Sequence, residues 1–173
     1  MSRASNTLIP LSRIGVVGVG HMGMPMAGHL LAAGLEVCVV DARETATSAF
    51  VARHPSGVVG GSLAELAAWA DTVLTMLPNG SIVRSVVLGG EDHTDSLAEG
   101  WIKRVAESDE RGGAPLLLEM SSSAPSGTRM LGATLAERGV AMVDAPVSGG
   151  VRGAEAGTLA IMAGGTPTEL DRC

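Results

Sequence analysis

Short apolar runs alternate with longer, mixed stretches along most of the chain. Six runs rich in Val, Leu and Ile are short enough to be strands buried on both faces of a sheet, and they lie at residues 14–19, 36–40, 58–59, 72–76, 116–120 and 141–143. The stretches between them predict helices at residues 22–33, 44–52, 62–70, 81–88 and 126–138. Apolar strands that alternate with helices are typical of a parallel sheet covered on both faces. The pattern therefore predicts an α/β fold of the Rossmann type, doubly wound around a mainly parallel sheet.

Residues 89–114 interrupt this alternation, because they form a long, polar and glycine-rich stretch. We expect an insertion in the domain here, with a surface helix at residues 95–106 that carries Trp101 on its inner face. A later apolar run at residues 159–162 predicts a seventh strand after a glycine-rich connection.

The last residues have the pattern of a helix start. Thr166, Pro167 and Glu169 suit the N-cap and first turn of a helix, but the chain stops within that turn. A helix so short does not hold itself together, so we interpret residues 166–173 as the start of a truncated linker helix. Residues 1–13 are then a polar lead, and residues 14–173 form one domain.

The composition narrows the choice of partners. Apolar residues make up 46% of the chain, which is enough for a core, but aromatic residues make up only 2%, so the stacking platforms of single-stranded nucleic-acid binding are missing. A net charge of -6 also argues against a phosphate polymer. We find no apolar stretch of membrane-spanning length and no secretory signal. Two cysteines, Cys38 and Cys173, form no disulfide framework. We therefore expect a cytoplasmic protein with neither nucleic-acid nor membrane partners.

Three glycines in the spacing G-x-G-x-x-G lie where the first predicted strand passes into the first predicted helix. Gly18 suits a tight turn, Gly20 lets a pyrophosphate approach the backbone, and Gly23 lets the helix lie close to the strand. Free N–H groups at the helix start favour phosphate groups. The motif predicts a dinucleotide-binding domain with cofactor contacts at Gly18, Val19, Gly20, His21, Met22 and Gly23. A merely flexible or tightly packed turn is the alternative explanation, and we expect the His21 side chain to be solvated.

An acid ends the second predicted strand. Asp41 can accept hydrogen bonds from the hydroxyls of the adenosine ribose, and its charge repels a 2′-phosphate. Arg43, two residues further on, could instead accept that phosphate. We predict that both residues contact the cofactor and that the cofactor is NAD, with NADP less favoured. Capping of the next helix is an alternative or additional role for Asp41.

Three further polar stretches follow predicted strands and should meet at the carboxyl edge of the sheet, where open α/β sheets bind ligands. They are MLPNGS at residues 76–81, EMSSSAPSG at residues 119–127 and DAPVSGG at residues 144–150. Taken singly, they are also explained by a strand end, a helix cap and a plain turn. Their shared placement favours a site, and their hydroxyl and N–H groups suit a small anionic substrate.

Several of these stretches together resemble the β-hydroxyacid dehydrogenases, the 3-hydroxyisobutyrate dehydrogenase family, over most of residues 14–165: IGVVGVGHMGMPMAGHLL, MLPNGS, SSSAPSG and DAPVSGGVRGAEAGTLAIMAGG. The related 6-phosphogluconate dehydrogenases share the VSGG core but not the surrounding residues. The resemblance implies that Leu77, Pro78 and Ser122 contact the cofactor, and that the substrate carboxylate is held by Ser148, Gly149 and Gly150. It also implies hydride transfer between nicotinamide and a short 3-hydroxy acid, of the 3-hydroxyisobutyrate or 2-hydroxy-3-oxopropionate type.

The same resemblance places the catalytic lysine on an all-helical C-terminal domain, which is absent here and would begin beyond Cys173. We therefore expect no catalytic residue in this chain, because Lys103 lies outside the family motifs and should be solvated. Glu119 stands where the family usually has Asp. The chain should bind its cofactor without turnover, and the apolar surface left by the missing domain favours homo-oligomers. The alternative is a non-catalytic dinucleotide-binding or regulatory module, or a truncated inactive gene product.

Overall fold

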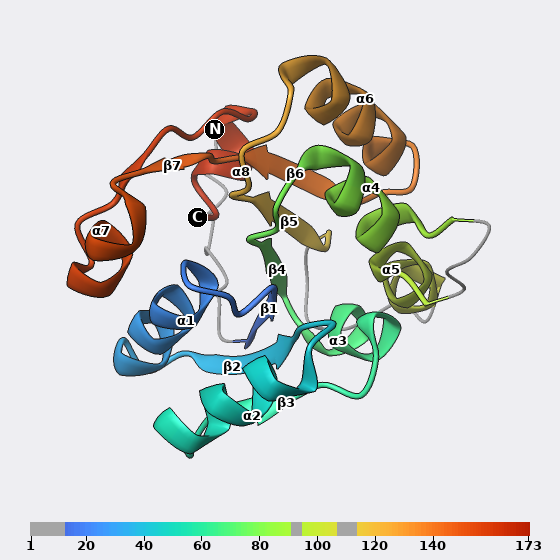
Figure 1. Ribbon diagram of the computed structural model, residues 1–173. Coiled ribbons are helices and arrows are strands. Elements are labelled where there is room, and N and C mark those ends of the chain that lie inside the picture. The colour runs from blue at the N-terminus through green and yellow to red at the C-terminus, as the bar shows by residue number, and fades with distance from the viewer. Residues whose placement is uncertain (1–12, 91–94, 107–113) are drawn as a thin grey trace, which may run out of the picture.

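Six parallel strands form the central sheet of the molecule, which the computed structural model describes at residues 13–90, 95–106 and 114–173 (Figure 1). The strands are β1 (Arg13–Val17), β2 (Glu36–Val40), β3 (Val58–Val59), β4 (Thr72–Thr75), β5 (Leu116–Glu119) and β6 (Ala141–Asp144). Their spatial order is β3-β2-β1-β4-β5-β6, and every neighbouring pair is parallel. The order reverses between β1 and β4, which is the switch point where doubly wound sheets bind ligands. The predicted fold class is confirmed.

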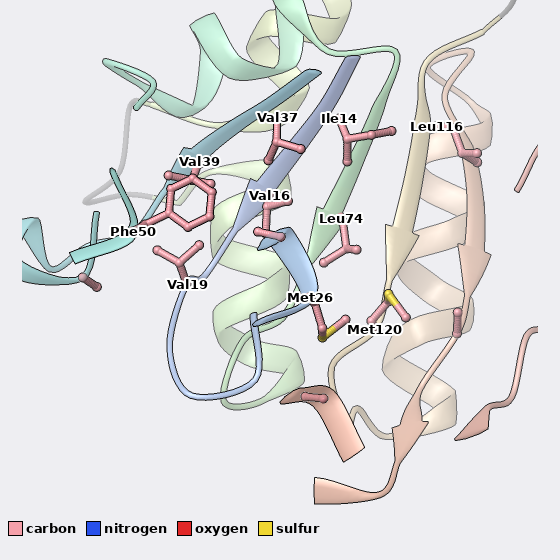
Figure 2. Packing of buried hydrophobic residues seen from close by; sticks show 14 of the residues in the cluster. Ile14, Val16, Val19, Met26, Val37, Val39, Phe50, Leu74, Leu116 and Met120 are labelled. Atoms are coloured by element: carbon pink, nitrogen blue, oxygen red, sulfur yellow. The ribbon is translucent and has the colours of Figure 1, made fainter. Parts of the chain in front are cut away.

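Helices cover both faces of this sheet. On one face, α1 (Gly23–Ala32), α2 (Glu44–Arg53) and α7 (Gly150–Ala156) share a core that includes Val16, Met26 and Phe50 (Figure 2). On the other face lie α3 (Leu63–Trp69), α4 (Gly80–Leu88), α5 (Leu97–Ala106) and α6 (Pro125–Ala136), which pack around Val17. Burial on both faces explains why the strands read as unbroken apolar runs. Within the described ranges, no helix is both long and apolar enough to cross a membrane.

Helix α5 belongs to the second helical layer and forms the predicted surface helix, because Glu99, Ile102 and Lys103 on its outer face are exposed. Trp101 faces inward, as predicted, and is 1% exposed. Gly100 lies so close to the backbone of Ala64 in α3 that a Cβ would not fit. The buried Arg104 donates to the Ala70 carbonyl and forms an ion pair with Asp71 at 3.6 Å. The described part of this long segment therefore completes the core.

The C-terminal part differs most from the prediction. The glycine-rich connection expected before the seventh strand contains helix α7. The predicted seventh strand exists as β8 (Ala160–Ile161), but it pairs antiparallel with β7 (Val147–Ser148) in a separate sheet of two strands. The predicted helix start is confirmed in α8 (Pro167–Leu170), where Thr166 and Glu169 form a reciprocal capping box.

Candidate functional site

A groove of about 890 Å³ lies at the carboxyl edge of the sheet, where the strand order reverses between β1 and β4. We call it the switch-point groove. Its walls include the β1–α1 turn, the end of β2 and the β4–α4 loop. It therefore brings together most of the predicted cofactor residues, namely Gly18, Gly20, His21, Met22, Gly23, Asp41, Arg43, Leu77 and Pro78.

The three glycines of the β1–α1 turn differ in what the fold requires of them. Gly18 has a φ of +93°, and a Cβ there would collide with the Met76 carbonyl oxygen. A Cβ at Gly23 would collide with the carbonyl oxygen of Gly18. At Gly20, a Cβ would meet only Nη2 of Arg43, at an ordinary contact distance of 3.5 Å. The described fold thus explains the first and third glycines but not the second, and Gly20 borders the groove.

Helix α1 begins at this groove without a cap. Its N-cap residue, Met22, forms no side-chain cap, and no acid lies in the first turn. Pro25, in that turn, has no N–H that could remain unpaired. The side chain of His21 is exposed, as expected. Backbone N–H groups and the positive end of the helix dipole are therefore available to phosphate groups at this point.

Asp41 links the β1–α1 turn to the end of β2. Its Oδ2 accepts the Val19 N–H at 2.9 Å, while its Oδ1 accepts the Arg43 N–H at 2.9 Å and Nε–H at 3.2 Å. Partial burial raises the pKa of the Asp41 carboxyl, but the hydrogen bonds from Arg43 and Val19 and the charge of Arg43 outweigh burial and lower the pKa below its usual value. Asp41 is therefore ionised at neutral pH. The N-cap of α2 is Arg43, so the alternative role of Asp41 as that cap is wrong.

A buried carboxylate joins the loops that follow β4 and β5. Glu119 is 1% exposed and accepts hydrogen bonds from Thr75 Oγ1 at 2.7 Å, Ser121 N–H at 3.2 Å and Ser123 Oγ at 3.1 Å. Ser121 Oγ in turn accepts the Leu77 N–H at 2.9 Å. Buried polar groups are costly unless they are paired. This network therefore fixes the loop after β4, which contains Leu77, against the loop after β5, which contains Ser121 and Ser123 and is called the serine loop below.

Two predicted cofactor residues lie outside the lining of the groove. Ser122 is exposed on the serine loop, next to the buried Ser121. Val19 donates its N–H to Asp41, and its side chain is buried in the core. The serines do not cap helix α6, whose N-cap is Ala124, so that alternative for the serine stretch is wrong.

The three predicted substrate residues lie together at the junction of β7 and α7, but not in the lining of the groove. Ser148, Gly149 and Gly150 are all exposed. Gly149 has a φ of +135° and Gly150 a φ of +61°, and such angles favour glycine with or without a ligand. Helix α7 is held on α1 by His29, whose Nε2 lies 2.9 Å from the Ala154 carbonyl oxygen.

One wall of the groove consists of residues that the sequence analysis did not single out: Leu63, Ile82, Ser85, Val86 and Asp95. A signal for two of them is present in the sequence. Val83 and Val87 of α4 are buried in the core, whereas Ile82 is exposed and Val86 is only partly buried against the core. Ile82 and Val86 form a second apolar pair four residues apart on the same helix. A helix with more apolar surface than one core needs indicates a second contact.

The reversed strand order, the turn with an open Gly20 and the ionised acid after β2 together define a dinucleotide-binding domain of the doubly wound α/β class. A family model described as the NAD binding domain of 6-phosphogluconate dehydrogenase matches residues 13–173. The chain belongs to this family.

Relatives of the chain include hydroxyacid dehydrogenases. It is 37% identical over 162 residues to the NAD-dependent L-serine dehydrogenase of Pseudomonas aeruginosa and 38% identical over 155 residues to the 3-hydroxyisobutyrate dehydrogenase of the same organism. These matches cover 94% and 90% of this chain, but 49% and 47% of the relatives. The chain thus spans about half the length of the curated relatives it matches.

A solved structure is similar to this chain in both sequence and fold. The 3-hydroxyisobutyrate dehydrogenase of Mycobacterium tuberculosis, solved with L-serine, superposes with a TM-score of 0.74 at 36% identity, over 94% of this chain and 49% of that one. The resemblance to the 3-hydroxyisobutyrate dehydrogenase family that the motifs indicated is confirmed by these relatives.

Proposed function

We propose that this chain is the NAD-binding part of an oxidoreductase that transfers a hydride between nicotinamide and a short 3-hydroxy acid. The observation that carries the proposal is the open backbone of Gly20 at the uncapped start of α1. The membership of an NAD-binding family supports it. The proposed substrate is of the 3-hydroxyisobutyrate or 2-hydroxy-3-oxopropionate type, and a relative named 3-hydroxyisobutyrate dehydrogenase supports the first of these.

The proposed cofactor lies along the switch-point groove. The pyrophosphate binds to the backbone of Gly20, His21 and Met22, because these residues border the groove at the positive end of α1. The adenosine ribose binds Asp41, and the nicotinamide extends past Leu77 and Pro78 towards Ser122. When bound, the nicotinamide supplies or accepts the hydride, while the residues of this chain bind and orient it.

The substrate carboxylate is proposed to bind Ser148, Gly149 and Gly150, where a hydroxyl and exposed backbone lie together. Oxidation of a hydroxyl releases a proton that a general base must accept. We assign this base to a lysine of the helical C-terminal domain, since Lys103 is exposed on α5 and lines no part of the groove. The proposal includes a cytoplasmic location and a homo-oligomeric state.

Titration of NADH with the 173-residue chain tests the proposal. We expect a saturable change in nicotinamide fluorescence with a dissociation constant below the millimolar range, weaker binding of NADPH, and competition by ADP-ribose, which shares the diphosphate and the adenosine. No saturable change up to millimolar concentrations would contradict the proposed function.

A further inference from the structure

Asp95 lies at the groove although it belongs to the long segment between α4 and β5. Its Oδ2 accepts the Leu63 N–H at 2.8 Å and its Oδ1 accepts the Ala64 N–H at 2.9 Å, so the carboxylate is fixed at the start of α3. Asp95 is exposed and, with Leu63, lines the switch-point groove. Two backbone N–H groups therefore hold the Asp95 carboxylate in one place, although the side chain is exposed.

The start of α3 lies at the adenosine end of the groove. Just before α3, Gly60 donates its N–H to the Val39 carbonyl in β2 at 2.9 Å, and β2 ends at the residue before Asp41. With the ribose on Asp41, the base attached to it enters the section lined by Leu63, which the apolar α4 residues Ile82 and Val86 complete. A flat, mostly apolar base fits this section of the groove. This placement of the adenine rests on the proposed function.

Asp95 retains the capacity to bind this base. An ionised carboxylate offers about four acceptor sites, and the two helix N–H groups use one on each oxygen. Asp95 shares the start of α3 with Ser62, whose Oγ accepts the Glu65 N–H at 3.1 Å, so the remaining acceptor sites of Asp95 are not needed to cap this helix. Adenine carries an exocyclic amino group that donates hydrogen bonds, whereas hypoxanthine carries a carbonyl oxygen at the same carbon.

We propose that Asp95 is a specificity-determining residue of the cofactor site, which accepts a hydrogen bond from the exocyclic amino group of the adenine. A carbonyl oxygen in place of the amino group cannot donate a hydrogen bond to the Asp95 carboxylate. The two groups repel each other, because both are hydrogen-bond acceptors. The long segment thus supplies both Trp101 to the core and a base-reading carboxylate to the groove.

The test compares NADH with reduced nicotinamide hypoxanthine dinucleotide, in which a carbonyl oxygen replaces the amino group of the base and the neighbouring ring nitrogen N1 carries a proton. The full 173-residue chain is titrated with each by nicotinamide fluorescence. We expect the wild type to bind NADH at least tenfold more tightly, because loss of a hydrogen bond to a charged group costs about that factor or more. In Asp95→Asn, which keeps an acceptor for α3 and adds a donor for the carbonyl, the ratio of affinities should fall at least tenfold.

Glu99→Gln is the matched control, since it removes an exposed acid from the first turn of α5 that does not line the groove. Its ratio should equal that of the wild type. A merely structural role of Asp95 would weaken both dinucleotides alike, so an Asp95→Asn ratio within threefold of the wild-type ratio would overturn the inference. Should this variant not fold, equal binding of the two dinucleotides by the wild type overturns it. Failure of the proposed function is distinct, because then neither dinucleotide binds.

Discussion

Gly20→Val should weaken NADH binding by a factor of about a hundred or more while leaving the fold intact. The turn tolerates a Cβ at this position, since the nearest atom is Nη2 of the exposed Arg43 side chain at 3.5 Å. A diphosphate on the backbone does not tolerate it, because the branched side chain occupies the space of the phosphate oxygens and holds them beyond hydrogen-bond distance. Fluorescence titration gives the affinity, and far-UV circular dichroism with thermal unfolding gives the state of the fold.

Two other glycines supply the controls for this experiment. Gly132→Val in α6 places a side chain where a Cβ makes only an ordinary 3.6 Å contact with Met142 Sδ, so affinity should stay at the wild-type value. Gly23→Val should disrupt the turn itself, because its Cβ collides with the Gly18 carbonyl. If Gly20→Val bound NADH within threefold of the wild type, the steric account of this turn would be wrong.

Asp41→Ala should reduce the preference for NADH over NADPH at least tenfold. Its Oδ2 has one acceptor site beyond the bond from Val19, so it can receive a ribose hydroxyl, and such bonds to a charged group contribute about 1.5–3 kcal/mol. The substitution also removes the charge that repels a 2′-phosphate. It further releases the Arg43 side chain from its 3.2 Å contact, and a free guanidinium pairs readily with phosphate.

The ratio of the two dissociation constants, measured by fluorescence titration, checks this prediction. Asp41→Asn separates charge from geometry, because the amide oxygen can still accept one of the backbone N–H groups that Asp41 holds. Glu44→Gln removes a nearby exposed charge from the first turn of α2 without touching the groove, so it should leave the ratio unchanged. An unchanged ratio in Asp41→Ala would show that Asp41 serves only to link the β1–α1 turn to the end of β2.

The strands of the sheet, the β1–α1 turn and Asp41 could be predicted from the sequence, because their signals are local. Apolar runs such as residues 72–76 are buried on both faces whatever their neighbours are, and the G-x-G-x-x-G spacing fixes a turn within a few residues. Asp41 follows from its distance to that turn.

The position of α5 could not be predicted in this way, because it depends on partners far along the chain. Arg104 looks like a surface residue until the Ala70 carbonyl and Asp71 are placed beside it. Gly100 likewise looks like a helix breaker until α3 packs against it. The contribution of Asp95 to the groove has the same origin, since it needs the placed start of α3.

Helix α7 was missed because tertiary contacts override its local preference. Its sequence is rich in glycine, which favours a turn. Burial of Gly153 and Ala154 and the contact of His29 with the Ala154 carbonyl stabilise the helix against α1. The antiparallel pairing of β8 with β7 follows the same logic, because a short apolar run does not tell which strand it will join.

The most direct test of the central claim follows the backbone amides of the ¹⁵N-labelled chain by NMR while ADP-ribose is added. If the diphosphate binds the main chain at the start of α1, the amide resonances of Gly20, His21 and Met22 should show the largest shifts and saturate together. If these amides stay unchanged while ADP-ribose binds and shifts resonances elsewhere, the diphosphate does not lie on this turn and the account is wrong.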